Sequence, residues 1–281
     1  MPYHWSFAIL VLVQAALVAL PRAGAVAVPA LARLRSRWWA LIPLASIVAV
    51  VVAVSPGGGN GQRLAWLALV TTPPLAALAL GWGMRGARAW LAVVVVPLFA
   101  LAWGEGGTVV GDLAALALTA LGCLALGVLL AAVAPPRWLR WGIVAMAVVD
   151  AVLVLSENLQ PAAHALDIAG TAGGLPQLQR AGLDGATMGY GDLFLAAALG
   201  GVLARQGRPQ GRIAVAMALI GLAFGLLFWV LDTLPATVPV ALALGVDAWL
   251  AAPRPRALAG RHLGARRREP PPLLRSAPRI R

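Results

Sequence analysis

Three aspartates stand inside long apolar segments of this sequence: Asp150, Asp192 and Asp247. An ionisable group in hydrocarbon costs about 2.5–3.5 kcal/mol on insertion scales, so each of them is a candidate for function. Asp150 lies about 5 residues before the end of its segment and Asp192 about 4 residues after the start of the next, which puts both carboxyl groups roughly 6–8 Å below one membrane surface. Two carboxyl groups at matching depth on consecutive antiparallel helices are placed to act as a pair.

Such a pair has a known chemistry. Two carboxyl groups that face each other in a low-dielectric site cannot both ionise cheaply, so together they hold one proton. An aspartic protease uses this arrangement: the ionised member takes a proton from water while the other protonates the peptide carbonyl oxygen. Two glycines precede Asp192 in Gly189-Tyr190-Gly191, and their lack of bulk would let water and a substrate backbone approach. The alternative is a flexible helix start from which Asp192 reaches the membrane surface.

The third aspartate is too far away to join the pair. Asp247 lies about 13 residues, or roughly 20 Å, into the last apolar segment, near the opposite surface. We expect it to have a structural role, with a tail arginine such as Arg254 as its partner.

The composition predicts what kind of scaffold holds these aspartates. Apolar residues make up 61% of the 281 residues and charged residues 11%, with a mean hydropathy of +0.85. A soluble domain is about half apolar and a quarter charged, so a soluble enzyme and a disordered chain are both excluded. The sequence therefore predicts an all-α polytopic membrane protein. Nine segments approach the length of about 20 apolar residues that a span needs: 5–20, 38–54, 64–82, 89–103, 113–134, 138–155, 188–204, 213–231 and 234–251.

Arginines between the segments predict the orientation. They gather in the loops after the first, third, fifth and seventh segments and in the tail, whereas the intervening loops carry more acidic residues. Basic loops stay cytoplasmic, so the N-terminus is expected outside and the C-terminus inside a cell membrane, by composition a bacterial plasma membrane. The net charge of +12 is divided among these loops, which argues against nucleic-acid binding and favours contact with membrane lipid.

The chain divides into three parts by this pattern. Residues 1–137 would form a five-helix membrane bundle, 138–251 would carry the paired aspartates and a long outer loop at 156–187, and 252–281 would be a disordered Arg/Pro-rich cytoplasmic tail. The glycine-containing loop is either a plain linker or a substrate-docking segment whose extended edge pairs with an unwound substrate.

The sequence lacks the residue groupings that other catalytic or cofactor-dependent chemistries need. The single cysteine, Cys123, excludes an internal disulfide and a thiolate metal cluster. His164 stands alone in the outer loop, and no His/Cys/Glu grouping has zinc spacing. No serine–histidine pair is placed for nucleophilic catalysis. We therefore expect a metal-free site without a cofactor.

Gly189-Tyr190-Gly191-Asp192 resembles the GxGD signature of the intramembrane aspartyl proteases, the family of presenilin and signal peptide peptidase. That family carries its first catalytic aspartate in span six, where Asp150 lies here. The resemblance covers the nine-span plan and three short motifs in the last half of the chain. It implies that Asp150 and Asp192 are catalytic and that Gly189, Tyr190 and Gly191 shape the substrate site.

A third motif of the family, Pro-Ala-Leu, opens span nine, and Pro235-Ala236-Thr237 occupies that place here. The resemblance implies that these three residues also shape the site. The sequence departs from the family at Val149, where tyrosine is usual, and at Thr237, where leucine is usual. Pro239-Val240-Ala241-Leu242 is an alternative reading of this motif. The orientation matches signal peptide peptidase, which implies single-span substrates with a cytoplasmic N-terminus.

Three other functions stay open at this point. A prepilin-peptidase-like enzyme shares the GxGD element, the following Leu193-Phe194 and the small-residue run 196–201, but places its aspartates near the cytoplasmic face. A proton-coupled transporter could relay protons through the same two acids, although the chain has no internal repeat. A non-catalytic scaffold that binds membrane helices would explain the departures from the family motifs.

Overall fold

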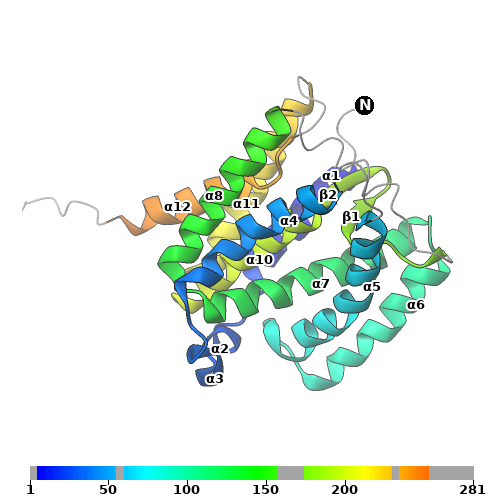
Figure 1. The fold of residues 1–281 in the computed structure, drawn as a ribbon, viewed down its shortest axis with the longest axis horizontal. Coiled ribbons are helices and arrows are strands. Elements are labelled where there is room, and N and C mark those ends of the chain that lie inside the picture. Colours follow the sequence, from blue (N-terminus) through cyan, green and yellow to red (C-terminus); the bar gives the residue numbers. More distant parts are fainter. Residues whose placement is uncertain (1–4, 55–59, 157–173, 230–233, 253–281) are drawn as a thin grey trace, which may run out of the picture.

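The computed structural model describes residues 5–54, 60–156, 174–229 and 234–252 (Figure 1). These residues are mostly helical, and each of the nine predicted segments contains a helix. The first five segments correspond to α1 (Trp5–Ala19), η1 (Arg37–Leu41) with α4 (Ile42–Val54), α5 (Asn60–Leu78) with η2 (Ala79–Gly83), η3 (Ala89–Val94) with α6 (Val95–Gly104), and α7 (Val109–Val133). The last four correspond to α8 (Pro136–Leu155), α10 (Tyr190–Arg205), α11 (Gln210–Phe224) with η5 (Gly225–Trp229), and α12 (Val238–Ala251). Two short helices, α2 (Ala23–Val26) and α3 (Pro29–Ala32), lie between the first two segments.

The apolar helices fall into two groups by length. Within the described residues, four helical stretches are long and apolar enough to cross a membrane: Gly61–Gly83, Val109–Val133, Pro136–Leu155 and Gln210–Trp229. Other apolar helices, α1 and α12 among them, have only 10–17 residues. The fold is therefore that of a helical chain with membrane-length helices, and the number of nine spans stays a prediction.

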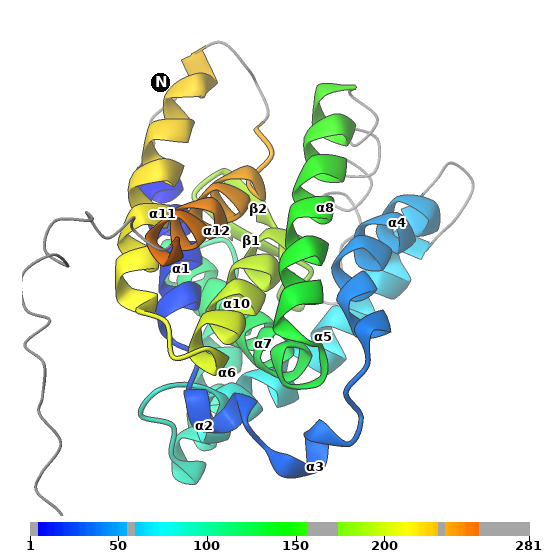
Figure 2. The same cartoon turned by 90° about the vertical axis from the view of Figure 1, so that its left-hand side faces the viewer.

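Helix α10 lies at the centre of the molecule, and its neighbours surround it (Figure 2). Every residue from Leu193 to Ala204 is buried. Small residues allow this close packing, as in other membrane proteins. A Cβ atom added at Gly127 of α7 would lie 2.5 Å from the backbone carbon of Ala197, and one at Gly200 would lie 2.6 Å from the carbonyl oxygen of Leu17 in α1. The backbones of α7, α10 and α1 thus touch without side chains between them.

A two-stranded hairpin precedes α10 and departs from the all-α prediction. Strands β1 (Arg180–Leu183) and β2 (Ala186–Gly189) pair antiparallel around the two-residue turn Asp184-Gly185. Both turn residues have positive φ, 46° and 82°, as a two-residue type I′ hairpin turn requires. Because β2 runs to Gly189, α10 begins at Tyr190 and not at 188 as predicted.

The largest apolar core contains residues from both predicted membrane parts of the chain, 1–137 and 138–251. Buried residues of α1 and α7 pack with those of α8, α10, α11 and α12 in one cluster. The second half therefore depends on the first for its packing, and for the position of whatever site it carries.

Candidate active site

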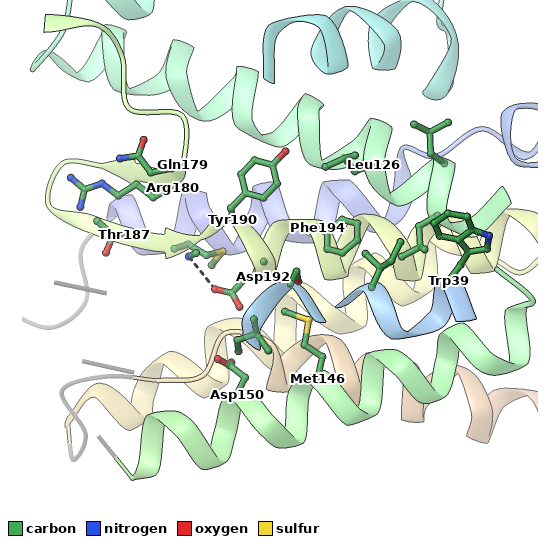
Figure 3. A pocket seen from close by; sticks show the side chains of 18 of the residues that line it. Trp39, Leu126, Met146, Asp150, Gln179, Arg180, Thr187, Tyr190, Asp192 and Phe194 are labelled. Carbon is green, nitrogen blue, oxygen red and sulfur yellow. Dashed lines mark hydrogen bonds between the residues drawn. The ribbon is translucent and has the colours of Figure 1, made fainter. Parts of the chain in front are cut away.

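Asp150 and Asp192 line the same cavity, which has a volume of about 580 Å³. Asp150 extends from α8 and Asp192 from α10 toward the space between these two helices (Figure 3). Asp150 is buried, with 6% of its surface exposed, and Asp192 is half-buried. The structure thus brings together the two aspartates that the sequence pairs by depth.

Apolar side chains form most of the remaining wall of the cavity. Helix α7 contributes Leu126, Leu129, Leu130 and Val133, and the α4 region contributes Trp39, Ile42 and Ile47. Met146 of α8 and Phe194 of α10 lie beside the two aspartates. Residues of the β1–β2 hairpin also line the cavity. The site therefore combines two acids with an apolar wall.

Asp150 is held by the segment that leads into α12. The hydroxyl group of Thr237 donates a hydrogen bond of 2.6 Å to Oδ2 of Asp150, and both side chains are buried. Thr237 is the residue that replaces leucine in the Pro-Ala-Leu-type motif. This contact favours Pro235-Ala236-Thr237 over Pro239-Val240-Ala241-Leu242 as the segment that faces the aspartates, since Pro239 already lies inside α12.

Asp192 is held by the start of its own helix. Its Oδ2 atom accepts a hydrogen bond of 3.0 Å from the backbone N–H of Gly189, three residues earlier. An acid at this position satisfies a backbone donor at a helix start. Each carboxyl group is thus oriented by a hydrogen bond from a neighbouring segment: Asp192 from Gly189 and Asp150 from Thr237.

Glycine fits each of the two glycine positions of the GxGD element for a different steric reason. A Cβ atom at Gly189 would lie 3.0 Å from Oδ2 of Asp192, and one at Gly191 would lie 3.1 Å from Cε of Met146 in α8. Glycine at the first position leaves room for the bent-back carboxyl group. Glycine at the second leaves room for the end of the Met146 side chain.

Tyr190 points away from Asp192 toward α7 (Figure 3). A Cβ atom at Gly122 of α7 would lie 3.4 Å from the Tyr190 hydroxyl oxygen. The backbone carbonyl of Tyr190 also accepts a contact of 3.5 Å from Sγ of Cys123. Tyr190 lines the cavity through its other atoms, and its ring anchors the start of α10 on α7.

Sequence reasoning missed one polar residue next to the site, Gln14 of α1. Its Nε2 atom donates to the carbonyl oxygens of Asp192, at 3.3 Å, and of Ala236, at 3.0 Å. The side chain is 1% exposed. The signal for Gln14 is an uncharged amide inside the first apolar segment, since a polar group buried in such a segment needs hydrogen-bond partners. Pro235 is buried in the turn before α12, next to Ala236.

Asp247 forms ion pairs with two arginines of the described residues. Its Oδ2 atom lies 2.5 Å from Nη2 of Arg140, and its Oδ1 atom lies 2.8 Å from Nη2 of Arg208. These arginines belong to the start of α8 and to the connection between α10 and α11. The predicted partner, Arg254, lies outside the described residues, as do His164 and most of the tail. The two ion pairs connect α12 to α8 and to the α10–α11 connection, which supports a structural role for Asp247.

Metal binding has no support in the part of the chain that the structure describes, where no three His, Cys, Asp or Glu side chains are grouped to hold an ion. Comparison with protein-family models, with curated proteins and with solved structures found no match for this chain. The case for a function therefore depends on the geometry of the site itself.

Proposed function

We propose that this protein is an intramembrane aspartyl endopeptidase, in which Asp150 and Asp192 hydrolyse peptide bonds of membrane-spanning substrates. One observation carries the proposal: two aspartates from consecutive long apolar segments line one cavity, each oriented by a hydrogen bond to its Oδ2 atom. Carboxyl groups are rarely placed in an apolar wall without a task that needs them. The resemblance to the GxGD family points to the same chemistry.

The reaction follows from the single proton that such a pair holds. The ionised carboxylate takes a proton from a water molecule, whose oxygen bonds to the peptide carbonyl carbon while the protonated carboxyl group gives its proton to the carbonyl oxygen. The tetrahedral intermediate, a gem-diol, then collapses: the C–N bond breaks, the leaving amine takes the proton from the protonated carboxyl group, and one gem-diol hydroxyl gives its proton to the other carboxylate as the C=O bond re-forms. The products are a carboxylic acid and an amine, and the pair again holds one proton. No metal or other cofactor takes part in these steps.

The surroundings of the aspartates suit a membrane helix as substrate. Leucine, isoleucine, methionine and tryptophan side chains in the wall would bury large apolar side chains. A helix must be unwound before its carbonyl can be attacked, and the extended chain then needs hydrogen-bond partners. Within the described residues β1 and β2 pair only with each other, so such a chain could pair with an outer edge of this hairpin.

The proposed orientation of the chain in the membrane follows from the arginine pattern. It places the aspartates near the outer face of a bacterial plasma membrane, with the N-terminus outside and the C-terminus in the cytoplasm. By resemblance to signal peptide peptidase, the substrates would be single spans with a cytoplasmic N-terminus. Proposed partners are such membrane helices and the surrounding lipid.

Reconstitution into liposomes with a single-span reporter of that orientation tests the proposal. Wild type should cut the reporter inside its span, and Asp150→Asn and Asp192→Asn should each abolish cutting, because neither acid alone can supply both proton transfers. Asp112→Asn is the matched control: Asp112 lies at the start of α7, and Oδ2 of Asp112 accepts from the backbone N–H of Asp184, which an asparagine oxygen can also do.

The possible outcomes separate the alternatives. Cutting that survives either variant would refute the paired mechanism. Proton-driven solute uptake that depends on both aspartates, without any peptide product, would identify a transporter instead. Binding of the reporter without either activity would support the scaffold interpretation.

A further inference from the structure

A single side chain of α1 connects the backbone of Asp192 to the segment whose Thr237 side chain bonds Asp150. Gln14 is 1% exposed, and its amide nitrogen donates to the carbonyl oxygens of Asp192 in α10 and of Ala236 before α12. These partners lie 178 and 222 residues away in sequence. A side-chain amide has two N–H donors, and both are used here.

The second of these bonds leads to Asp150 through one residue. Ala236 precedes Thr237, and the hydroxyl group of Thr237 donates to Oδ2 of Asp150 at 2.6 Å. The chain of contacts therefore runs from the backbone of Asp192, through Gln14 and the Ala236–Thr237 segment, to the Asp150 carboxyl group. Gln14 itself does not line the cavity, so it touches neither the reacting oxygens nor a substrate.

We propose that Gln14 is a positioning residue: it sets the spacing between Asp150 and Asp192 by tying the start of α10 to the segment that holds Asp150. The inference rests on the proposed protease function for its consequence in catalysis. Bonds from a buried amide to two carbonyls are strong in an apolar interior, where those carbonyls have no water to replace them. A misplacement of about 1 Å between catalytic groups lowers a rate on the order of 100-fold.

The chain offers a matched control in Gln210. This second buried glutamine is 2% exposed and also joins α1 to α10: its Nε2 atom donates to the carbonyl oxygens of Val18 and Pro21, near the end of α1, and of Gly200. None of these groups lines the cavity of the aspartates. Gln210→Met removes these three bonds and the one that Oε1 accepts from Arg85, against two for Gln14→Met. It should therefore lose at least as much thermal stability as Gln14→Met.

Kinetics of the reconstituted full-length protein on the single-span reporter give the first test. Gln14→Met should lower kcat on the order of 100-fold with KM within about twofold, since the bonds it loses position the acids and not the substrate. It should also change the pH dependence of kcat, because the two carboxyl groups no longer share a proton in the same geometry. Gln210→Met should retain the wild-type pH dependence and a kcat within about threefold. Equal kcat values and pH profiles for the two variants would overturn the proposal.

A distance measurement tests the positioning role of Gln14 without relying on protease activity. Spin labels at Val148→Cys in α8 and Leu242→Cys in α12, both exposed positions, report the spacing of these helices in a Cys123→Ser background. Gln14→Met should broaden or shift the distance distribution, and Gln210→Met should leave it unchanged. A distribution unaffected by Gln14→Met would refute the positioning role even if wild type cuts the reporter. Absence of cutting by wild type with an altered distribution would refute only the protease function.

Discussion

Thr237 is the residue that holds the Asp150 carboxyl group in the candidate site. Leucine at this position would offer no hydrogen bond, whereas the threonine hydroxyl donates to Asp150 from a fully buried side chain. A buried carboxyl group needs such a donor, because water does not reach every oxygen in an apolar wall. The residue thus stabilises the aspartate and orients it toward the cavity.

Replacing Thr237 with valine should separate the hydroxyl from the shape of the side chain. Thr237→Val leaves the Asp150 carboxyl group without its donor, at a cost of about 1–3 kcal/mol. We expect the rate of reporter cutting to fall about 10- to 100-fold, since each 1.4 kcal/mol is about a factor of ten. Thr237→Ser keeps the donor and should stay within about threefold of wild type. Equal rates for the valine and serine variants would show that the hydrogen bond has no part in catalysis.

Single residues differ in how far their roles could be predicted. Asp150 and Asp192 could be identified because a charge in an apolar segment is visible in the sequence and depth follows from helix rise. The partners of Asp247, and the contacts of Gln14, depend on which helices pack together. Arg140 and Gln14 lie 107 and 178 residues from the groups they bind, and periodicity along one chain segment carries no such information.

At the scale of helices, the contact between α7 and α10 determines where Asp192 lies. The residues at the interface are glycine and alanine, and two added Cβ positions, at Gly127 and Gly201, fall within 2.6 Å of the facing helix. In a membrane, close van der Waals contact of this kind is a main source of helix association. The position of Asp192 therefore depends on small residues well removed from it in sequence.

Gly127→Ala should destabilise the protein and reduce activity together. The new Cβ would lie 2.5 Å from backbone atoms of α10, so the helices must separate, at a cost of about 1–3 kcal/mol. Gly245→Ala in α12 is the control, because nothing lies within 4 Å of its added Cβ; it should be neutral or stabilising by up to about 1 kcal/mol. Thermal unfolding in micelles and reporter cutting measure both effects. Similar unfolding temperatures for the two variants would contradict this view of the interface.

The elements themselves were predictable to different degrees. Apolar runs of suitable length predicted every long helix of the described residues, because side chains that favour lipid need a backbone whose hydrogen bonds are satisfied internally. The hairpin β1–β2 was not predicted as such, although Asp184-Gly185 is a strong two-residue turn signal. Its strands have only four residues each, too short for an alternating pattern to be distinguished from a polar loop.

For the molecule as a whole, the sequence predicted the helices but not which of them pack against one another. α8 and α10 carry the aspartates, yet α10 is packed mainly against α7 and α1 from the first half of the chain (Figure 2). The tryptophans at positions 5, 38, 103, 138 and 249, near the ends of predicted segments, are exposed, whereas Trp82, also near such an end, is half-buried. Exposed tryptophans near helix ends are typical of a membrane interface. The orientation stays a prediction from the arginine pattern.

The central claim is that Asp150 and Asp192 act as one unit that shares one proton, and infrared spectroscopy of the reconstituted protein tests it without a substrate. At neutral pH the account predicts one protonated carboxyl stretching band from the pair. That band should shift or disappear in both Asp150→Asn and Asp192→Asn, because each variant breaks the same shared arrangement, and it should be unchanged in Asp112→Asn. A band that responds to only one of the two aspartates, or no protonated carboxyl band in wild type, would contradict the account.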